Sequence, residues 1–382
     1  METAKPIRFW NRKYGVMCLV NLLVSISIFA HFPLFTYSIG RFGDQPALQS
    51  WCIMGLSVGM FLLGPFNAYF VDAFRRKRVC EVSLVCLIIC TIVGSISSRL
   101  VMSCFLLLLA GACFGVFEMS LGATLINDLS ISKRRTATDY YFTWFGLFGL
   151  PLGAGLAVWG LHAIGVDNVY YVTLALQILS LLLLHPIKIP FRAPNRVPLM
   201  SFDRFFHPGA LLLMIALLPI AIVPGLFITG HWTYQLLFMM GGGFIIGFAI
   251  HRVFFMEADS RSDAVAGLIL VMTAMLVVMH SASPNAYWVS SVFLGVGLGW
   301  FDSRMLLYFV KMADHCQRGT LQQTYIITLI TGNCLGYVLG MQDINVQLLS
   351  LILAAVSLIF YLTVVLRWFK HIKGRDFKFR EI

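Results

Sequence analysis

Two acidic residues of this sequence, Glu118 and Asp302, occur in apolar surroundings with the same local pattern. The stretches GACFGVFEMS (111–120) and GVGLGWFDSR (295–304) share two glycines, a phenylalanine and an acid at a constant offset of 184 residues. A carboxylate among apolar groups is costly unless it faces a cavity or a partner. Carboxyl groups placed in this way can take up and release a proton or hold a cation. The repeat therefore predicts two matched exchange sites, one in each half of the chain.

The composition indicates what surrounds these acids. Hydrophobic residues make up 59% of the 382 residues and charged residues 12%, whereas soluble domains average about 45–50% apolar and about 25% charged residues. A soluble core could not bury so much apolar surface, so the composition predicts a membrane protein. We expect helices rather than barrel strands, because a helix satisfies its own backbone hydrogen bonds in lipid and the apolar runs exceed the length of a strand.

Uncharged runs define the expected spans. Seven runs without Asp, Glu, Lys or Arg are long enough to cross a bilayer once: 14–40, 45–71, 82–98, 140–166, 168–187, 319–342 and 344–366. Residues 100–126 form an eighth, interrupted only by Glu118, and the segments 205–251 and 264–313 are each long enough for two. We therefore expect an all-α, polytopic membrane protein with 12 transmembrane helices.

The distribution of charge predicts the orientation of the chain. The formal net charge is +11, and if the N-terminus is cytoplasmic, 26 of the 28 Lys and Arg residues fall on the cytoplasmic side. Only Arg41 and Arg99 fall on the other side. This pattern is the positive-inside rule, and it predicts that both termini are cytoplasmic. The basic surplus is thus a topology signal, and we expect no nucleic-acid partner.

No motif indicates a metal or an organic cofactor. Most of the nine cysteines lie within expected spans, where we interpret them as apolar helix residues, among them Cys52, Cys86, Cys90, Cys104, Cys113 and Cys334. Their spacing does not match a metal site. The chain also lacks a nucleotide-binding loop, so a proton gradient is the expected energy source.

The chain divides into two similar halves. Its longest connection, 188–208, contains four prolines and separates six expected spans from the next six. We expect an N-terminal six-helix bundle (1–187), a cytoplasmic linker (188–208), a C-terminal six-helix bundle (209–370) and a basic cytoplasmic tail (371–382). Internal duplication with polar residues embedded at matching places is typical of secondary transporters.

At this point the chain resembles the major facilitator superfamily over nearly its whole length. The stretch GPFNAYFVDAFRRKR (64–78) is similar to the family's loop motif between the second and third spans. The resemblance implies a conformational latch formed by Asp72, Arg76 and Lys77. The motif departs from the family pattern at three positions, which here are Ala68, Ala73 and Arg75. The corresponding stretch of the second half, GFAIHRVFFMEADSR, has no aspartate in register.

A second motif, GLFGLPLGAG (146–155), resembles a glycine-proline motif of exporting, proton-antiporting branches of the family. Its matching positions are the helix-packing residues Gly149, Pro151, Gly153 and Gly155. Small residues allow close helix contact and the proline bends the helix. Drug-exporting branches usually carry an arginine at the position of Leu107, so the resemblance to them is divergent.

Three hypotheses explain the embedded acids. In the first, Glu118 or Asp302 carries a proton or a cationic substrate as a central cavity opens to each side in turn. In the second, the acids pair with Arg304 or Lys311 and hold the two bundles together. Asp302 and Arg304 are about 200° apart on a helix, so Arg304 is better placed to reach Glu118. In the third, Glu118 is neutral and hydrogen-bonds to a nearby hydroxyl or amide.

Other polar and aromatic side chains of the expected spans are candidates for the substrate cavity. They are Asn21, His31, Tyr140, Tyr141, Trp144, Trp300, Tyr308, Tyr325, Asn333 and Tyr337. A tyrosine or tryptophan at these positions is equally consistent with an anchor at the membrane interface.

Together, these features predict a monomeric secondary active transporter of the bacterial inner membrane that works by alternating access in the lipid bilayer. Its expected activity is the proton-coupled export of a small organic molecule. The first alternative is a proton-coupled importer of a sugar or an organic acid. A remote alternative is a multi-pass membrane enzyme, which would need catalytic acids or histidines gathered at one membrane face.

Overall fold

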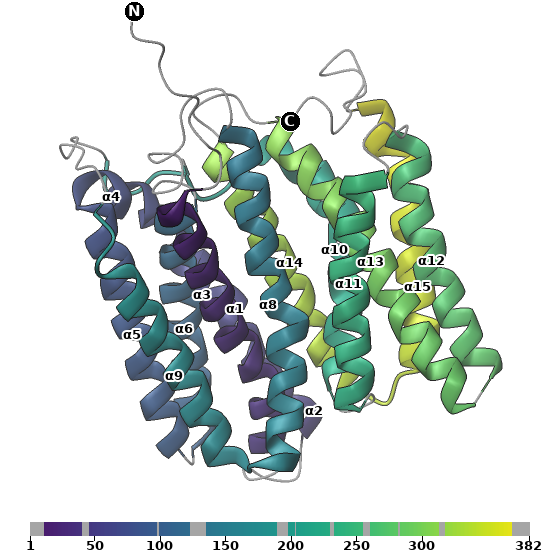
Figure 1. Cartoon of the computed structure of the whole chain (residues 1–382), viewed down its shortest axis with the longest axis horizontal. Helices are drawn as coiled ribbons and strands as arrows, with labels where there is room; N and C mark the ends of the chain where they lie inside the picture. The colour runs from purple at the N-terminus through teal and green to yellow at the C-terminus, as the bar shows by residue number, and fades with distance from the viewer. Residues whose placement is uncertain are drawn as a thin grey trace, which may run out of the picture.

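The computed structural model shows an all-helical bundle (Figure 1). It describes residues 11–39, 46–97, 99–122, 135–188, 198–202, 204–229, 233–254, 260–281, 283–312 and 318–368. The expected basic tail, 371–382, lies outside these residues, as do positions 189–197 and 203 of the expected linker.

The first half of the described chain contains six spans. They are α1 (Arg12–Ile39), a composite second span, α5 (Arg76–Ile96), α6 (Leu100–Ser120), α8 (Arg135–Ala163) and α9 (Val166–Leu184). The composite span consists of α2 (Pro46–Gln49), η1 (Ser50–Ile53), α3 (Met54–Leu63), η2 (Gly64–Phe66) and α4 (Asn67–Ala73).

The second half also contains six spans. They are α10 (Leu211–Ile228), α11 (Tyr234–Phe254), α12 (Ser260–His280), α13 (Pro284–Met312), α14 (Arg318–Gly340) and α15 (Val346–Phe360). The short helix η4 (Pro208–Ala210) precedes α10, and the π-helical turn η5 (Tyr361–Val365) continues α15. The described chain thus has the twelve spans expected from the sequence.

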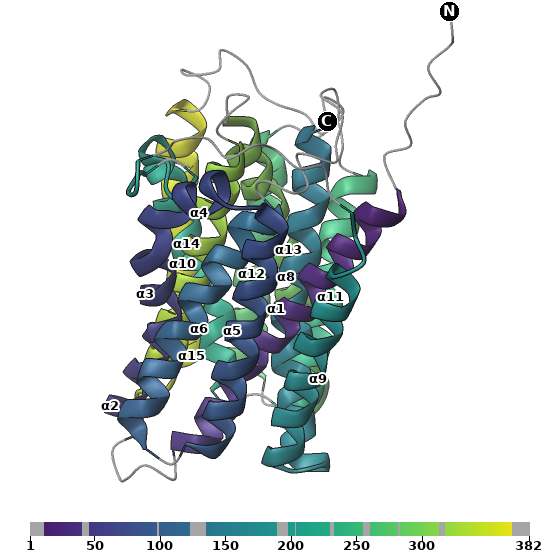
Figure 2. The same cartoon turned by 90° about the vertical axis from the view of Figure 1, so that its left-hand side faces the viewer.

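Figure 1 shows α1 to α9 on one side of the bundle and α10 to α15 on the other. Figure 2, which views the first half from its own side, shows its helices running in the same general direction as those behind them. The end at which α1 begins and α11 ends carries Lys13, Arg76 and Arg252, and we call it the basic end. The connection between α5 and α6, with Arg99, lies at the opposite end.

Helix α14 differs from the other spans in polarity. Eleven spans of the described chain contain a window that is long and apolar enough to cross a membrane, and α14 does not. Its polar side chains are nevertheless buried, among them Gln322, Gln323 and Thr328. They are covered by protein, because α14 packs against α10 of its own half and against α3, α6 and α8 of the other. The most polar span therefore lies at the interface between the halves.

Glycines allow close helix contact beneath each embedded acid. A Cβ added to Gly111 of α6 would lie 2.0 Å from the carbonyl oxygen of Leu56 in α3. A Cβ added to Gly295 of α13 would lie 2.0 Å from the carbonyl oxygen of Met240 in α11. The acid follows each glycine by seven residues, and thus lies on nearly the same helix face. The internal repeat of the sequence therefore corresponds to a repeated helix packing.

The glycine-proline motif makes a second close contact, between α8 and α1. A Cβ at Gly149 would lie 2.4 Å from Ser25 Cβ, and one at Gly153 would lie 2.4 Å from Ile26 O. Helix α14 repeats this packing against α10, where the matching pair is Gly332 and Gly336. The sequence of the second half does not show the full motif, because Cys334 stands where the first half has Pro151. The other motif glycine, Gly155, faces Phe238 of α11.

We expect Gly111→Ala to lower the thermal unfolding temperature in detergent, because the added methyl group meets main-chain atoms that cannot move aside. Overpacking of this kind costs about 1–3 kcal/mol. Gly242→Ala is the matched control, since a Cβ there meets nothing within 4 Å. An unchanged unfolding temperature for Gly111→Ala, with Gly242→Ala also unchanged, would show that the α3–α6 contact yields easily.

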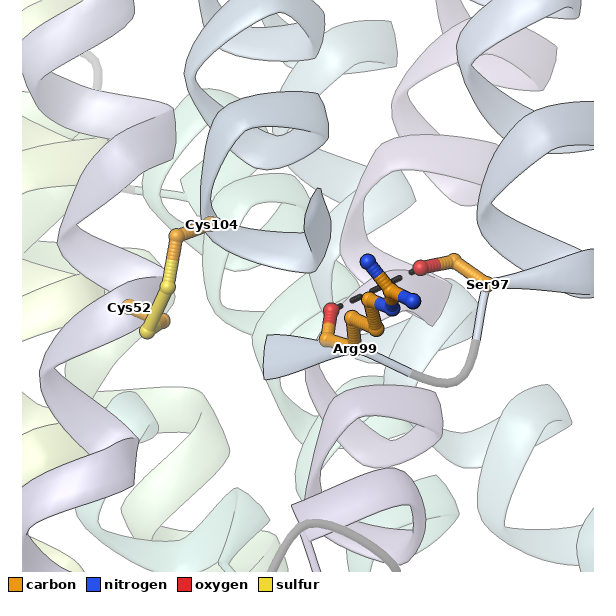
Figure 3. The surroundings of a disulfide bond; sticks show 4 residues. All are labelled: Cys52, Ser97, Arg99 and Cys104. Atoms are coloured by element: carbon orange, nitrogen blue, oxygen red, sulfur yellow. Dashed lines mark hydrogen bonds between the residues drawn. A yellow bond between two sulfur atoms is a disulfide. The ribbon is translucent and has the colours of Figure 1, made fainter. Parts of the chain in front are cut away.

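A disulfide joins Cys52 of η1 to Cys104 of α6 (Figure 3). It lies at the end opposite the basic end, near Ser97 and Arg99 of the connection between α5 and α6. The interpretation of Cys52 and Cys104 as plain apolar helix residues is therefore wrong. The two thiols meet because the second and fourth spans run side by side and are held close by the glycine contact. The sequence separation of 52 residues does not reveal this proximity.

Candidate functional site

Both embedded acids are enclosed by protein. Glu118 in α6 is 3% exposed and Asp302 in α13 is 5% exposed. Glu118 Oε2 and Asp302 Oδ1 have no hydrogen-bond partner among the described residues. Glu118 lies near the described end of α6, at the basic end, whereas Asp302 lies near the middle of α13. Each half thus buries one unpartnered carboxyl oxygen beside its glycine contact.

Arg304 does not pair with either of these acids. Its Nη1 lies 3.5 Å from Asp263 Oδ2 of α12, and its guanidinium carbon lies 5.2 Å from the centre of the Tyr308 ring. The hypothesis that Arg304 reaches Glu118 across the halves is therefore not supported in this conformation. The guanidinium points into the second half because α12 supplies a carboxylate there. The expected separation of Asp302 and Arg304 around the helix agrees with this geometry.

Asp263 is the centre of a buried polar cluster. Its Oδ1 accepts a hydrogen bond from Trp300 Nε1 at 2.6 Å, and its Oδ2 contacts His251 Nε2 and Arg304. The other ring nitrogen of His251, Nδ1, lies 2.8 Å from Ser303 Oγ. Three helices, α11, α12 and α13, contribute to this cluster, and all five residues are largely inaccessible to solvent. The candidate cavity residue Trp300 therefore holds Asp263 inside the second half.

The cluster reaches the first half through aromatic residues of α8. Tyr140 Oη lies 2.5 Å from Ser303 Oγ, and Tyr141 Oη accepts a hydrogen bond of 2.7 Å from Arg252 Nε. The Trp144 ring packs edge-on against a phenylalanine of α11, with ring centres 4.9 Å apart. Three of the predicted cavity residues, Tyr140, Tyr141 and Trp144, thus lie at the contact between the halves.

A second contact closes the basic end between α6 and α14. Gln323 Nε2 donates a hydrogen bond of 3.3 Å to the carbonyl oxygen of Gly115, one turn before Glu118. Nearer the middle of the bundle, the hydroxyls of Ser57 in α3 and Thr331 in α14 are 2.6 Å apart. The basic end of the interface is therefore closed by α6 and α8 against α13 and α14.

The remaining candidates are distributed over several contacts. Asn21 donates from Nδ2 to Phe142 O at 3.3 Å within the first half, and Asn333 bonds its own helix. Tyr325 donates to Asp302 O at 3.4 Å. Tyr308 and Tyr361 share a hydroxyl contact of 3.0 Å inside the second half, and Tyr337 reaches Thr36 of α1 at 2.8 Å, at the end opposite the basic end. The geometry therefore places Tyr337 between the halves and Asn21 and Tyr308 inside them.

The arrangement of these helices is similar to that of several solved transporters. The human organic anion transporter MFSD10 (TETRAN) has a TM-score of 0.67 at 14% identity, over 92% of this chain and 99% of that chain. The nucleoside transporter NupG has a TM-score of 0.64 at 11% identity, over 93% and 99%. A bacterial homologue of the iron transporter ferroportin, in its outward-facing state, has a TM-score of 0.67 at 13% identity, over 96% and 100%.

The fold is that of the major facilitator superfamily. No protein-family model matches the sequence, and no curated protein matches it. The similarity to these transporters is therefore one of architecture.

In this major facilitator fold, Asp72 occupies the place expected for the latch. Its Oδ1 lies 3.2 Å from Arg76 Nη2 and 3.1 Å from Nη2 of Arg204, a residue of the connection between the halves. The main-chain N–H of Arg204 donates to Thr320 Oγ1 at the start of α14 at 2.9 Å. Arg204 thus carries the contact from α4 to the second half. The third latch residue, Lys77, lies 3.6 Å from Glu81 Oε1 on its own helix.

The first half of the major facilitator fold contains a cavity between its helices. Its lining includes His31 of α1, Leu107 of α6 and Tyr170 of α9. His31 Nδ1 donates to Ser27 O at 2.7 Å, which leaves Nε2 as the acceptor nitrogen of the ring. Leu107 stands where drug-exporting branches usually carry arginine, so this cavity has an apolar wall in place of a cation.

The residues that sequence reasoning missed are Asp263, His251, Ser303 and Arg204. Asp263 immediately precedes the long apolar segment 264–313 in the sequence and lies in the first turn of α12. His251 lies in the last turn of α11, in the stretch that lacks an aspartate in register. The sequence contains one signal for His251: it follows Gly247 by four residues, as Asp72 follows Ala68.

Proposed function

We propose that this protein is a secondary active transporter that moves a small organic molecule across a membrane by alternating access, coupled to protons. The observation that carries the proposal is the pair of buried carboxyls, Glu118 and Asp302, one in each half and each with an oxygen that lacks a hydrogen-bond partner among the described residues. Such groups in a membrane are typical of proton and ion pathways. Each named structural neighbour is a transporter, which favours this function over a membrane enzyme.

The two six-helix parts, 1–187 and 209–370, are the units that we propose move against each other about the linker 188–208. The closed contacts of α6 and α8 with α13 and α14 correspond to one end of that motion. The ferroportin homologue supports this interpretation of the closed basic end, because its outward-facing state has a TM-score of 0.67 and its inward-facing state one of 0.63. One chain supplies both halves, so we propose that the monomer is the working unit.

We propose that the basic end faces the cytoplasm and that the membrane is the bacterial inner membrane. The first support is the charge distribution, because cytoplasmic segments carry an excess of Lys and Arg. The second support is the Cys52–Cys104 disulfide at the opposite end, because disulfides persist in oxidising compartments. The two signals are independent, since one depends on basic side chains and the other on thiols.

Export is the proposed direction. The contact of Gly149 and Gly153 with α1 supports it, because the motif that makes this contact resembles that of exporting branches. An amphipathic substrate suits the aromatic residues Tyr140, Tyr141 and Trp144, which lie where the halves meet. The named neighbours are an organic anion transporter, a nucleoside transporter and a homologue of an iron transporter, and these classes define the first compounds to test.

The proposal is tested by flux in proteoliposomes. Compounds that raise the unfolding temperature of the purified protein are loaded as radiolabelled substrates, and a pH gradient of either sign is applied. We expect net movement of at least one compound against its concentration gradient when protons flow the other way. Movement with the protons would support import instead, and no gradient-driven movement of any stabilising compound would contradict transport.

A cross-linked variant provides the matched control. Ser57→Cys with Thr331→Cys, in a background that keeps only Cys52 and Cys104, places two thiols where two hydroxyls are now 2.6 Å apart. Oxidation should stop flux by joining the halves, and reduction should restore it. The two single-cysteine variants receive the same treatments and should keep their flux, which separates this effect from reduction of the native disulfide.

A further inference from the structure

The buried cluster around His251 connects the inside of the second half to the contact between the halves. His251 is 0% exposed and Asp263 is 2% exposed. From α12 to α8 the contacts run from Asp263 to His251, from His251 to Ser303 at 2.8 Å, and from Ser303 to Tyr140 at 2.5 Å. Neither Glu118 nor Asp302 takes part in this chain.

The donors around Asp263 fix the hydrogen-bond pattern. The indole N–H of Trp300 and the guanidinium of Arg304 can only donate, so Asp263 accepts from both as a carboxylate. Nε2 of His251 faces the same carboxylate and therefore carries a hydrogen. In a neutral ring, Nδ1 then accepts from the Ser303 hydroxyl, and Ser303 Oγ accepts from Tyr140. The closed end thus has a consistent set of hydrogen bonds when His251 is neutral.

A proton on His251 disrupts this pattern. Nδ1–H would then donate to Ser303 Oγ, and the Ser303 hydrogen would have to turn towards Tyr140, so the bond that joins the halves would reverse. The proton would also add a positive charge to a closed region that contains one carboxylate from α12 and a guanidinium from α13. The titratable and charged groups that face this region from the surrounding elements are Asp263, Arg304, Arg252, Tyr140, Tyr141, Tyr308 and Tyr361.

The other contact at the basic end is of a different chemical kind. Asp72 holds α4 to the start of α14 through Arg204, in an ion pair between a carboxylate and a guanidinium. His251 lies four residues after Gly247, which is the same spacing that separates Asp72 from Ala68. Histidine is the side chain whose charge ordinarily changes between about pH 5 and about pH 8.

We propose that His251, held by Asp263, is a proton-binding positioning residue whose neutral form closes the basic end through Ser303 and Tyr140. Acid on that side binds a proton to His251 and favours separation of α8 from α13, which admits water to the ring. The inference rests on the proposed alternating access and adds the control of one of its ends. His251 acts through Tyr140 and does not touch the substrate.

The opening is measured directly by the distance between two spin labels. Phe74→Cys of the α4 end and Phe254→Cys of the α11 end place one exposed label on each half, in a background that keeps only Cys52 and Cys104 as native cysteines. We expect the long-distance population to rise by about threefold between about pH 8 and about pH 5.5. His251→Gln, whose amide can donate to Asp263 and accept from Ser303, should remain closed at both pH values.

Two further variants complete the test. His185→Gln changes an exposed histidine at the same end and should keep the full pH response. Ser303→Ala leaves His251 in place but removes the hydroxyl that joins it to Tyr140, and should lose the response. A full pH response in both His251→Gln and Ser303→Ala, or its absence in the parent protein, would overturn the inference. The measurement needs no substrate, so a failed flux assay with a normal pH response would count against the proposed transport alone.

Discussion

Glu118→Gln is expected to reduce proton-driven net flux at least about tenfold while leaving substrate exchange intact. Glutamine keeps the size of the side chain and its place beside the α3 contact, but it cannot carry a proton. Exchange of labelled for unlabelled substrate needs no net proton movement, so it should survive. Asp302→Asn should behave in the same way if both halves contribute a carrier. Flux driven by a pH gradient and counterflow in the same proteoliposomes measure the two quantities.

Glu81→Gln is the matched control for this prediction. Glu81 is a partly exposed acid of α5 that contacts Lys77 and His185 at the basic end. Its replacement should change neither quantity. Full proton-driven flux in both Glu118→Gln and Asp302→Asn would show that the embedded acids serve only the packing of their helices, and the proton-carrier proposal would be abandoned. Loss of flux in only one of them would assign the carrier to that half.

Asp263→Asn is expected to have the largest effect on stability. The change removes the carboxylate that faces Arg304, His251 and Trp300, and so breaks the ion pair with the buried guanidinium of Arg304. Breaking a buried ion pair by removing one partner typically costs about 3–5 kcal/mol. We expect a large fall in the yield of monodisperse protein and in the unfolding temperature in detergent.

A second substitution separates charge from packing. Asp263→Asn combined with Arg304→Gln removes both charges and should recover much of the unfolding temperature lost in the single variant, because no unpaired charge remains. If Asp263→Asn alone unfolds at the temperature of the parent protein, the guanidinium has another adequate partner, and the central role of Asp263 is incorrect.

Much of the architecture could be predicted from the sequence, because membrane spans are encoded locally. Long uncharged runs predicted the spans, and the repeat around Glu118 and Asp302 predicted the two halves, in which the structure shows the same close helix contact beneath each acid. Asp72 could be singled out as a latch candidate because its motif is contiguous. Each of these features depends on residues that are near one another in the chain.

The interior of the second half could not be predicted, because its contacts join distant positions. Helix geometry gave the direction of Arg304 but could not show that α12 places Asp263 beside it. The Cys52–Cys104 pair was missed for the same reason. The boundaries of the expected domains and the roles of the site residues remain predictions for the experiments above.

The polarity of α14 has a consequence for biosynthesis. A helix without a sufficiently apolar window gains little free energy when it moves by itself from the protein-conducting channel into the lipid, because the lipid offers no partner for its amides and hydroxyls. Gly332 and Gly336 fit α14 closely to α10, a highly apolar helix that is synthesised earlier. Stable integration of α14 should therefore require α10 to remain beside the channel until α14 has been synthesised. Chains released before α10 and α14 have paired should be exposed to quality-control proteases.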